Sequence, residues 1–336
     1  MVIEKNKSLL SYNSFHIETQ AENFVSITDA EQLKSILQEE AGKPVWVLGG
    51  GSNILFTKNV KGWVLKMDIR GIEEIKEDDL HVYVRAGAGE NWHSFVLYTL
   101  GRNWAGLENL SLIPGCVGAA PIQNIGAYGV ELKDVFYELE AYDRKNGKIY
   151  TFGLNDCAFG YRDSFFKSGE KNRYIILNVT FILNKIAVLN SSYGAIRAEL
   201  EQMDIRTPSI RSVSQAVINI RRSKLPDPAE IGNAGSFFKN PVVDQSLFLT
   251  LSKAFPDIPA YPHEEGSVKL AAGWLIEQCG WKGYRKGDAG VHQRQSLVLV
   301  NYGHATGKEI FELGEAVAAS VKKKFGISLE REVNVW

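Results

Sequence analysis

Two segments rich in small residues are the parts of this chain best suited to bind a ligand through the backbone. The first, residues 48–55, reads Leu-Gly-Gly-Gly-Ser-Asn-Ile-Leu and follows an apolar run. The second, residues 113–129, is dominated by glycine, alanine and proline, which would break an ordinary helix or strand. Backbone without large side chains can come close to another group, and its N–H groups can then bind an anion. Two such loops in one chain predict a dinucleotide held on both sides.

Neither loop fits the usual dinucleotide-binding fingerprint G-x-G-x-x-G. That motif needs its third glycine where a helix packs on a strand. Counted from Gly49 and Gly51, this position holds Ile54, and the chain continues to Phe56 as another strand-like run. The segment Gly87-Ala-Gly89 lacks the third glycine as well. A Rossmann domain is therefore not expected, and the plainer alternative for the first loop is a β-turn.

The composition is that of an ordinary globular protein of 336 residues, long enough for two or three domains. A net charge of -1 argues against a nucleic-acid or anionic-membrane partner. No apolar run approaches the roughly 20 residues of a membrane span, and the first residues lack the core of a signal peptide. Three scattered cysteines and six histidines without metal-ligand spacing predict reduced thiols and no metal. We therefore expect a cytoplasmic protein.

Hydrophobic periodicity predicts an α+β organisation. Asp29 should cap a helix in which Leu33 and Ile36 share one face. The other predicted elements are strands at 45–48, 63–67, 81–85, 136–142, 174–183 and 296–301, and helices at 91–100, 212–222 and 268–279. The capping box Thr306-Gly-Lys-Glu309 should open a last helix that Gly326 ends. The proline-punctuated segment 225–228 is the best candidate for a domain boundary.

Five motifs occur in an order that resembles one enzyme family. They are Gly49-Gly-Gly-Ser-Asn53, Pro114-Gly-Cys-Val-Gly118, Gln123-Asn-Ile-Gly-Ala-Tyr-Gly129, Gly160-Tyr-Arg-Asp163 and Gly235-Ser-Phe-Phe-Lys-Asn240. Together they resemble the UDP-N-acetylenolpyruvoylglucosamine reductases, flavoenzymes of bacterial peptidoglycan synthesis, over about residues 10–335. The resemblance implies an α+β, FAD-binding fold of the vanillyl-alcohol-oxidase type. Its two subdomains would be residues 1–66 with the strand 327–336, and residues 67–222; a C-terminal α+β substrate domain would be residues 223–326.

The resemblance also implies FAD as a non-covalent cofactor and NADPH as co-substrate. Relatives with covalent FAD often carry a histidine in the first loop, where this chain has Ser52 and Asn53. The cofactor-binding residues that the resemblance implies are Gly49, Gly50, Gly51, Ser52, Asn53, Pro114, Gly115, Gly118, Gln123, Asn124, Ile125, Gly126, Ala127, Tyr128 and Arg221.

The implied reaction delivers a hydride from NADPH, by way of FAD, to C3 of an enolpyruvyl ether and a proton to C2. Negative charge that spreads into the substrate carboxylate needs a cation, and C2 needs a proton donor. The resemblance assigns the first role to Arg162, whose guanidinium is a planar fork for a carboxylate, and the second to Ser236. Without the motifs, a surface arginine and a turn serine bonded to its own backbone are the plainer interpretations.

Glu332 matches the third catalytic position of the family. It could donate a hydrogen bond to the developing enolate only when protonated, and the adjacent arginine would favour the charged form. Glu330 is a nearby alternative, and fraying of the chain end would weaken the assignment of Glu332. The sequence does not decide between these alternatives.

The substrate-binding residues that the resemblance implies are Tyr193, Lys224, Asn240 and Gln295. Lys224 would meet a diphosphate as a point charge, and Tyr193 would close over the nucleotide as a lid. The expected partners are therefore a nucleotide sugar and NADPH, with no nucleic acid and no membrane. We expect a monomer.

Two other functions stay open on the sequence alone. One is an FAD-dependent oxidase or dehydrogenase that acts on an alcohol and shares the same fold. NADPH would not rapidly bleach the flavin of such an oxidase. The other is a non-catalytic protein that binds nucleotide sugars, which would be colourless when purified.

Overall fold

The computed structural model describes residues 2–39 and 42–336, and the chain divides into two units. The first unit comprises residues 2–7, 21–39, 42–50 and 61–223, and the second comprises residues 8–20, 51–60 and 224–336. Two short N-terminal segments thus belong with the C-terminal third of the chain. The division expected from the sequence places these segments in the first FAD-binding subdomain, and the finer split into two such subdomains stays a prediction.

A four-stranded sheet with the order β1-β2-β5-β3 forms one layer of the first unit. Its strands are β1 (Ile3–Ser8), β2 (Gln20–Ile27), β5 (Val60–Met67) and β3 (Val45–Leu48). Helix α1 (Ala30–Glu39) begins after Asp29, whose Oδ1 accepts a hydrogen bond from the N–H of Gln32 at 2.8 Å. This confirms the predicted cap. Leu33 and Ile36 of α1 are buried in the core that this sheet lines.

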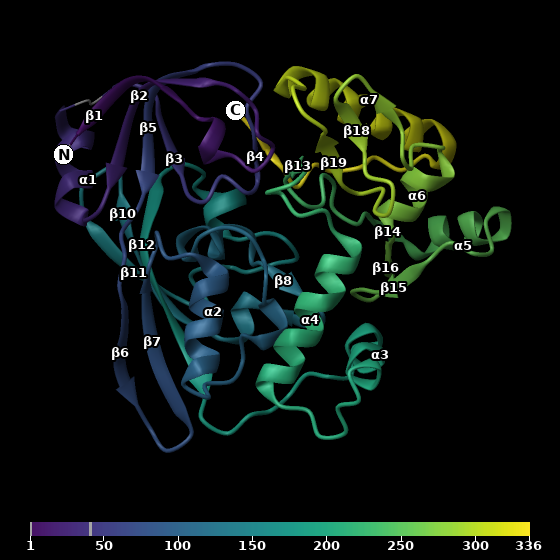
Figure 1. Ribbon diagram of the computed structural model, residues 1–336, viewed down its shortest axis with the longest axis horizontal. Helices are drawn as coiled ribbons and strands as arrows, with labels where there is room; N and C mark the ends of the chain where they lie inside the picture. Colours follow the sequence, from purple (N-terminus) through teal and green to yellow (C-terminus); the bar gives the residue numbers. More distant parts are fainter. Residues whose placement is uncertain (1, 40–41) are drawn as a thin grey trace. The chain divides into compact units, whose positions relative to one another are not determined.

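A larger, antiparallel sheet with the order β11-β10-β12-β7-β6 carries the rest of the first unit. Its strands are β11 (Ile149–Gly153), β10 (Phe136–Asp143), β12 (Tyr174–Asn184), β7 (His81–Gly87) and β6 (Ile72–Glu77). Helix α2 (Trp92–Gly101) lies alongside its long strands (Figure 1). The rings of Trp92 and Phe95 pack on Phe181 of β12 with centroids 5.9 and 4.8 Å away. This packing fixes the first turn of α2, which borders the second glycine segment.

Two further helices, α3 (Gly194–Gln202) and α4 (Ile210–Lys224), form a small core of their own. Ile196 and Leu200 of α3 are buried against Val213 and Val217 of α4. Tyr128 of the second glycine segment packs on the same cluster. The helix pair therefore supports the end of that segment.

The second unit combines short strands with three helices. One sheet has the order β13 (Gly232–Asn233), β19 (Leu299–Asn301), β18 (Ala289–Val291) and β17 (Arg285–Lys286), and another has the order β14 (Val242–Asp244), β16 (Ser267–Leu270) and β15 (Ala260–Pro262). The helices are α5 (Gln245–Ala254), α6 (Ala272–Gln278) and α7 (Gly307–Phe325). At the chain end, β20 (Asn334–Val335) pairs in parallel with β4 (Ile54–Leu55). This pairing explains why residues 51–60 belong to the second unit.

Helix α7 begins and ends as its sequence predicts. Thr306 Oγ1 accepts a hydrogen bond from the N–H of Glu309 at 3.3 Å, and the Glu309 carboxylate accepts from the N–H of Thr306 at 2.7 Å. Gly326 ends the helix with a φ of +74°, a conformation that favours glycine. The predicted capping box and stop are therefore confirmed.

The predicted helix at 268–279 is wrong in its first turn. Val268 and Leu270 are buried while Lys269 between them is partly exposed, which is the two-residue period of a strand. Residues 267–270 accordingly form β16 between β14 and β15, and α6 begins only at Ala272. The predicted strand at 296–301 is likewise shorter, because the N–H of His292 donates to the carbonyl of Val298 and closes a turn before β19.

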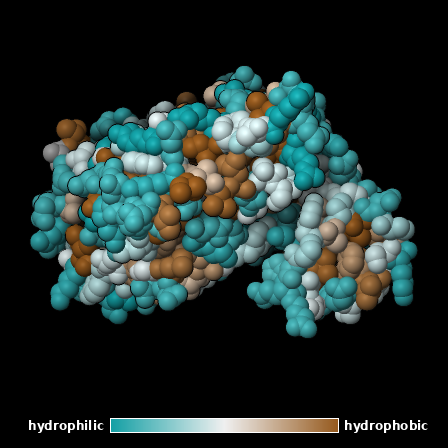
Figure 2. All heavy atoms as spheres, turned by 90° about the horizontal axis from the view of Figure 1, so that it is seen from below, coloured by the Kyte–Doolittle hydropathy of each residue, from teal (hydrophilic) through white to brown (hydrophobic). Residues whose placement is uncertain are grey.

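The described chain holds no helix long and apolar enough to span a bilayer. On the face drawn in Figure 2, hydrophilic residues predominate and hydrophobic residues gather only in small groups between them.

Candidate active site

Within the first unit, Gly50 of the first glycine segment packs on the second glycine segment, which in turn packs on the end of β7. A Cβ placed on Gly50 would lie 2.8 Å from the Cα of Gly115, and one placed on Gly118 would lie 2.5 Å from the Cβ of Ala88. The N–H of Gly118 donates to the carbonyl of Ala88 at 2.9 Å. The missing side chains thus let loop pack directly on loop.

The same loops carry backbone donors that the protein does not use. In the described part of the chain, the N–H groups of Gly50, Gly115 and Cys116 have no hydrogen-bond acceptor. Because Gly50 touches Gly115, these donors are neighbours. Unused N–H groups in a loop without bulky side chains are what a diphosphate requires. These residues therefore fit a diphosphate group, as the predicted cofactor would require.

Three residues of the second glycine segment or beside it adopt left-handed backbone angles that non-glycine residues rarely take. Their φ values are +58° for Leu112, +42° for Asn124 and +51° for Tyr128. Such angles persist only where the surroundings hold them, and they cluster at functional sites. The surroundings hold Asn124 through its side chain. Its buried amide donates hydrogen bonds to the Glu131 carboxylate and to the carbonyl of Gly160, both at 3.0 Å. Its side chain is thus bound to the protein itself.

The other predicted cofactor residues continue along the same loops. Pro114 precedes the turn Val117–Ala119, Gln123 ends the turn Pro121–Gln123, and Ile125 leads into the short strand β8 (Gly126–Ala127). In the first loop, Gly49 belongs to the first unit, whereas Gly51, Ser52 and Asn53 belong to the second. There Gly51 has a φ of +65°, and a Cβ on it would clash with the carbonyl oxygen of Tyr12 at 1.9 Å.

Arg162 is held against the second glycine segment by a tight turn. The carbonyl of Gly160 accepts from the N–H of Asp163, and the N–H of Gly160 donates back to the carbonyl of Asp163. Arg162 sits at the tip of this turn with a φ of +53° and is half-buried. Its Nη2 donates to the carbonyl of Gly126 at 2.5 Å. The turn therefore places a guanidinium beside the second glycine segment.

Arg221 of α4 adds a second cation near this position. Its Nε donates to the carbonyl of Leu112 at 3.2 Å, and it makes no ion pair within the described chain. Burial lowers the pKa of its guanidinium, and the charge of Arg162 acts in the same direction. The charge of Arg162 thus reaches Arg221. Guanidinium groups at such a position suit an anionic group.

Tyr193 rests on the second glycine segment. It precedes α3, its ring meets that of Tyr128 edge to face with centroids 5.6 Å apart, and it is 47% exposed. Burial raises the pKa of the Tyr128 hydroxyl, which keeps it protonated at neutral pH. The structure therefore brings the predicted lid residue to a predicted cofactor residue.

In the second unit, Ser236 lies in a segment fixed on both sides. The N–H of its neighbour Phe237 donates to the carbonyl of Leu297 at 2.8 Å, and the carbonyl of Phe237 accepts from the N–H of Glu332 at 2.9 Å. The Ser236 hydroxyl itself is half-buried and makes no hydrogen bond to the described chain. A turn serine bonded to its own backbone is therefore not what the structure contains.

The two charged residues just before Glu332 form ion pairs with other parts of the second unit. The carboxylate of Glu330 pairs with Lys239, and Arg331 pairs with Glu315 at 3.1 Å on α7. The Asn53 amide donates to the carbonyl of Glu332 at 3.2 Å, and β20 is paired just after it. The chain end is thus anchored, and Glu332 is half-buried while the two charges beside it are engaged elsewhere.

Two of the predicted substrate residues meet at the start of α6. Asn240 Oδ1 accepts from the N–H of Ala272 at 3.0 Å, and a Cβ on Gly273 would lie 3.1 Å from Gln295 Oε1. Gln295 also belongs to the turn that contains Leu297, and the carbonyl of Leu297 accepts the hydrogen bond from the N–H of Phe237. Lys224 is exposed at the last residue of α4.

Comparison with known proteins gives a consistent assignment. Residues 227–336 match the family described as UDP-N-acetylenolpyruvoylglucosamine reductase, C-terminal domain, and residues 21–153 match an FAD binding domain. The chain is 52% identical to the UDP-N-acetylenolpyruvoylglucosamine reductase of Amoebophilus asiaticus, over 100% of this chain and 99% of the relative. It is 51% identical to that of Flavobacterium johnsoniae, over the full length of both. The chain belongs to the UDP-N-acetylenolpyruvoylglucosamine reductase family.

The fold agrees with this family. The crystal structure of the reductase from Thermus caldophilus superposes with a TM-score of 0.70 at 24% identity, over 100% of this chain and 99% of that one. A vanillyl-alcohol-oxidase-type flavoprotein from Myceliophthora thermophila gives 0.50 at 12% identity, over 91% and 70%. The predicted FAD-binding fold with a C-terminal reductase domain is confirmed. Full-length similarity to reductases also decides against the alcohol oxidase and the non-catalytic binding protein.

One contributor to the reductase site was not predicted from the sequence. The buried amide of Asn109 donates to the carbonyls of Tyr128 and Asn190, at 3.0 and 2.9 Å, and so joins the glycine segment to the loop before Tyr193. The Asn190 amide donates in return to the carbonyl of Gly129 at 3.1 Å. The only available signal was a polar pair, residues 108–109, inside an otherwise apolar run.

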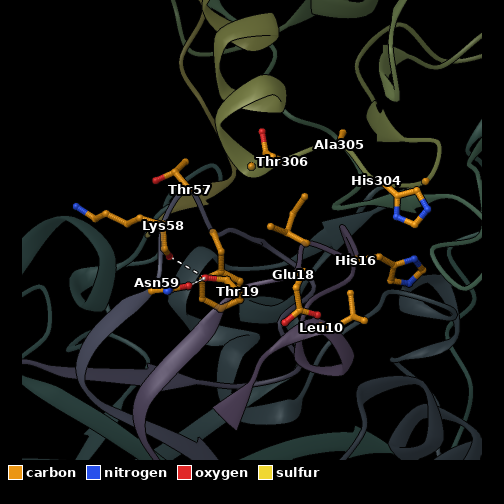
Figure 3. A pocket seen from close by; sticks show the side chains of 14 residues that line it. Leu10, His16, Glu18, Thr19, Thr57, Lys58, Asn59, His304, Ala305 and Thr306 are labelled. Carbon is orange, nitrogen blue, oxygen red and sulfur yellow. Dashed lines mark hydrogen bonds between the residues drawn. The ribbon is translucent and has the colours of Figure 1, made fainter. Parts of the chain in front are cut away.

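A pocket of about 570 Å³ lies within the second unit, and none of the predicted site residues lines it. Its lining includes His16, Glu18, Lys58, His304 and Thr306, and Figure 3 shows His16 and His304 near each other at one side of it. Thr19 Oγ1 donates to the carbonyl of Lys58 at 2.9 Å. The polar lining side chains are mostly exposed, and the helix end that borders the pocket is already capped by Thr306.

Proposed function

We propose that this chain is the NADPH- and FAD-dependent enzyme that reduces UDP-N-acetylglucosamine enolpyruvate to UDP-N-acetylmuramate, a step of peptidoglycan precursor synthesis. Membership of the reductase family supports the reaction. The observation on which the assignment of residues depends is the Ser236 hydroxyl, half-buried and unbonded in a segment that Leu297 and Glu332 fix from two sides. A hydroxyl held in this way can donate its proton to a substrate.

FAD, when bound, supplies the transfer of a hydride from NADPH to the enolpyruvyl group. The unused N–H groups of Gly50, Gly115 and Cys116 would bind its phosphates, and Arg221 would provide positive charge near the same loop. We propose that FAD is bound non-covalently. Burial raises the pKa of the Cys116 thiol, so this cysteine is not a ready nucleophile for a covalent link.

Arg162 is the proposed partner of the substrate carboxylate. Its guanidinium keeps its charge at working pH and forms two parallel hydrogen bonds with a carboxylate. The charge of Arg221 acts on the same region, which favours an anion there. Stabilising the negative charge that develops on the substrate would lower the barrier to hydride delivery at C3.

Ser236 is the proposed donor of the proton to C2. A serine hydroxyl is a weak acid, but an enolate carbon is a strong base, so the transfer is feasible when the serine is correctly oriented. The backbone bonds of Phe237 supply that orientation. We propose that Glu332, whose N–H makes one of these bonds, contacts the enolate.

We further propose that Tyr193 closes over the nucleotide, that Lys224 meets its diphosphate, and that Asn240 and Gln295 contact the substrate from the start of α6. The edge-to-face contact of Tyr193 with Tyr128 supports a coupling of this lid to the cofactor loop. We propose that the enzyme works in the cytoplasm as a monomer.

The assignment can be tested with the purified wild-type protein. NADPH should bleach the flavin absorbance under anaerobic conditions, and UDP-N-acetylglucosamine enolpyruvate should restore it. Mass spectrometry should detect UDP-N-acetylmuramate, two mass units heavier than the substrate. A protein that binds FAD but whose flavin is not reoxidised by the enolpyruvyl substrate would overturn the proposal.

A further inference from the structure

The first turn of α2 binds the backbone at three points between residues 110 and 115, where the second glycine segment begins. Trp92 Nε1 donates to the carbonyl of Leu110 at 2.9 Å, and the N–H of Trp92 donates to the carbonyl of Gly115 at 3.0 Å. Between them, the N–H of Leu112 donates to His93 Nδ1 at 2.9 Å. Two of these contacts come from a tryptophan buried in the core, and the third comes from a half-buried histidine.

Leu112 is the strained residue of this stretch, and side chains hold its peptide groups from both directions. Its φ of +58° is costly for leucine, because the side chain crowds the backbone in the left-handed region. Its N–H is bound by His93 of α2, and its carbonyl accepts from Nε of Arg221 on α4 at 3.2 Å. Neither bond belongs to regular secondary structure, so the unusual angle depends on these two side chains.

His93 can serve Leu112 only as an acceptor at Nδ1, which requires the neutral imidazole with its proton on Nε2. Burial lowers the pKa of His93, and Arg222 and Arg221 lower it further. Those arginines, both on α4, are the charged groups that act on it. Its own helix has no acidic residue in the first turn, and the Glu108 carboxylate is bound to the N–H of Gly106. A positive charge at the second residue of a helix is also disfavoured by the helix dipole.

We infer that His93 is a positioning residue, which fixes Leu112 through Nδ1 and thereby sets the path of residues 113–118 toward FAD. The inference rests on the proposed function insofar as it requires that segment to bind FAD. Loss of the acceptor would let Leu112 relax, and the N–H groups of Gly115 and Cys116 would no longer be preorganised for a diphosphate.

The test uses two variants of similar shape and measures FAD binding rather than turnover. In His93→Asn, Oδ1 occupies the place of Nδ1 and still accepts a hydrogen bond, whereas His93→Leu removes the acceptor. His81→Asn is the control, since His81 bonds Asp78 at the far end of β7. Titration of FAD-free protein at pH 7.5, followed by flavin fluorescence, should show at least a tenfold loss of affinity for His93→Leu. His93→Asn should stay within threefold of wild type, and His81→Asn should be unchanged.

A second experiment measures the pH dependence of FAD affinity, and it does not require the His93→Leu variant. Because the pKa of His93 is lowered from its ordinary value of 6.5, acidification well below pH 6.5 is needed to protonate it. Protonation should abolish the acceptor and add a charge beside two arginines, so FAD affinity should fall through that lower pH range. His93→Asn cannot titrate there and should lack that fall. Identical pH profiles for wild type and His93→Asn, or wild-type affinity in His93→Leu, would overturn the inference while leaving the proposed function intact. Wild-type protein that binds no FAD at any pH would instead overturn both.

Discussion

The backbone N–H of Glu332 donates a hydrogen bond to the carbonyl of Phe237 at 2.9 Å, which ties the proposed third catalytic residue to the neighbour of Ser236. The two residues are 95 positions apart in the sequence, so only the fold brings them together. On either side of Glu332, the charged side chains are paired with other residues: Glu330 with Lys239 and Arg331 with Glu315. The two charged residues beside Glu332 thus have ion-pair partners of their own.

This arrangement predicts different outcomes for two neighbouring glutamates. Glu332→Ala should lower kcat by about 100-fold, in the range of a lost acid–base group. Glu330→Ala, which removes the exposed carboxylate of the Lys239–Glu330 ion pair, should change kcat by less than twofold. Steady-state kinetics with both substrates saturating gives the comparison. Comparable losses in the two variants would mean that Glu332 has no special role, and near-wild-type activity of Glu332→Gln would indicate that the residue works in its neutral form.

Arg162→Lys should retain the charge but lose the planar fork. We expect kcat to fall about 100-fold, because a point charge stabilises the developing carboxylate charge less well. Arg211→Lys is a suitable control, since the exposed Arg211 bonds only the side chain of Asn103 among residues 2–39 and 42–336. FAD content, measured from the absorbance ratio of the purified proteins, should be the same in both. Unchanged kcat in Arg162→Lys would remove Arg162 from the proposed chemistry.

Two glycine-to-alanine variants separate the effect of crowding between the loops from the effect of the substitution itself. In Gly118→Ala, the new Cβ would lie 2.5 Å from that of Ala88, so the loops must move apart. We expect about 1–3 kcal/mol lower free energy of unfolding, and weaker FAD binding. A Cβ on Gly101 meets nothing within 4 Å, and Gly101→Ala should be neutral or slightly stabilising. Chemical denaturation and FAD titration measure both effects, and equal behaviour of the two variants would contradict this interpretation of the loops.

The Asp143–Arg173 pair should make stability depend on acid pH. Arg173 donates to both carboxylate oxygens of Asp143, at 3.1 and 2.9 Å, and holds the pKa of Asp143 below its ordinary value of 3.8. A lowered pKa stabilises the folded state above pH 4, and this stabilisation is lost as the pH falls through the folded pKa. The difference in unfolding free energy between wild type and Asp143→Asn should therefore be largest near pH 7 and should shrink toward pH 3. A difference that stays constant over this range would show that the charge is not responsible.

Elements with strong local signals could be predicted from the sequence. The capping box of Thr306 and Glu309, and the cap at Asp29, specify helix starts without help from the rest of the chain. Val268–Leu270 was misassigned because three residues with apolar ends fit a helix and a strand equally well. Only its pairing with two neighbouring strands decides between them.

The motifs predict the residues of the candidate site, and these assignments stay predictions. The contacts that hold these residues in place could not be predicted. The bond from Asn53 to Glu332 and the pairing of β4 with β20 span about 280 residues and leave no periodic trace in the sequence. His93 and Asn109 are single polar residues whose partners are backbone atoms of distant segments. Such contacts depend on tertiary packing, so a sequence pattern cannot reveal them. The assignment of each catalytic role stays a prediction that kinetics must test.

The most direct test of the proposed chemistry follows the two half-reactions of Ser236→Ala separately by anaerobic stopped-flow absorbance, with Ser267→Ala as a control in the same unit. We predict that NADPH reduces the flavin of Ser236→Ala at nearly the wild-type rate. Reoxidation by the enolpyruvyl substrate should be slower by about 10³-fold or more, because no proton reaches C2. Ser267→Ala should match wild type in both steps. If both half-reactions of Ser236→Ala slowed equally, or if reoxidation kept its wild-type rate, Ser236 would not be the proton donor.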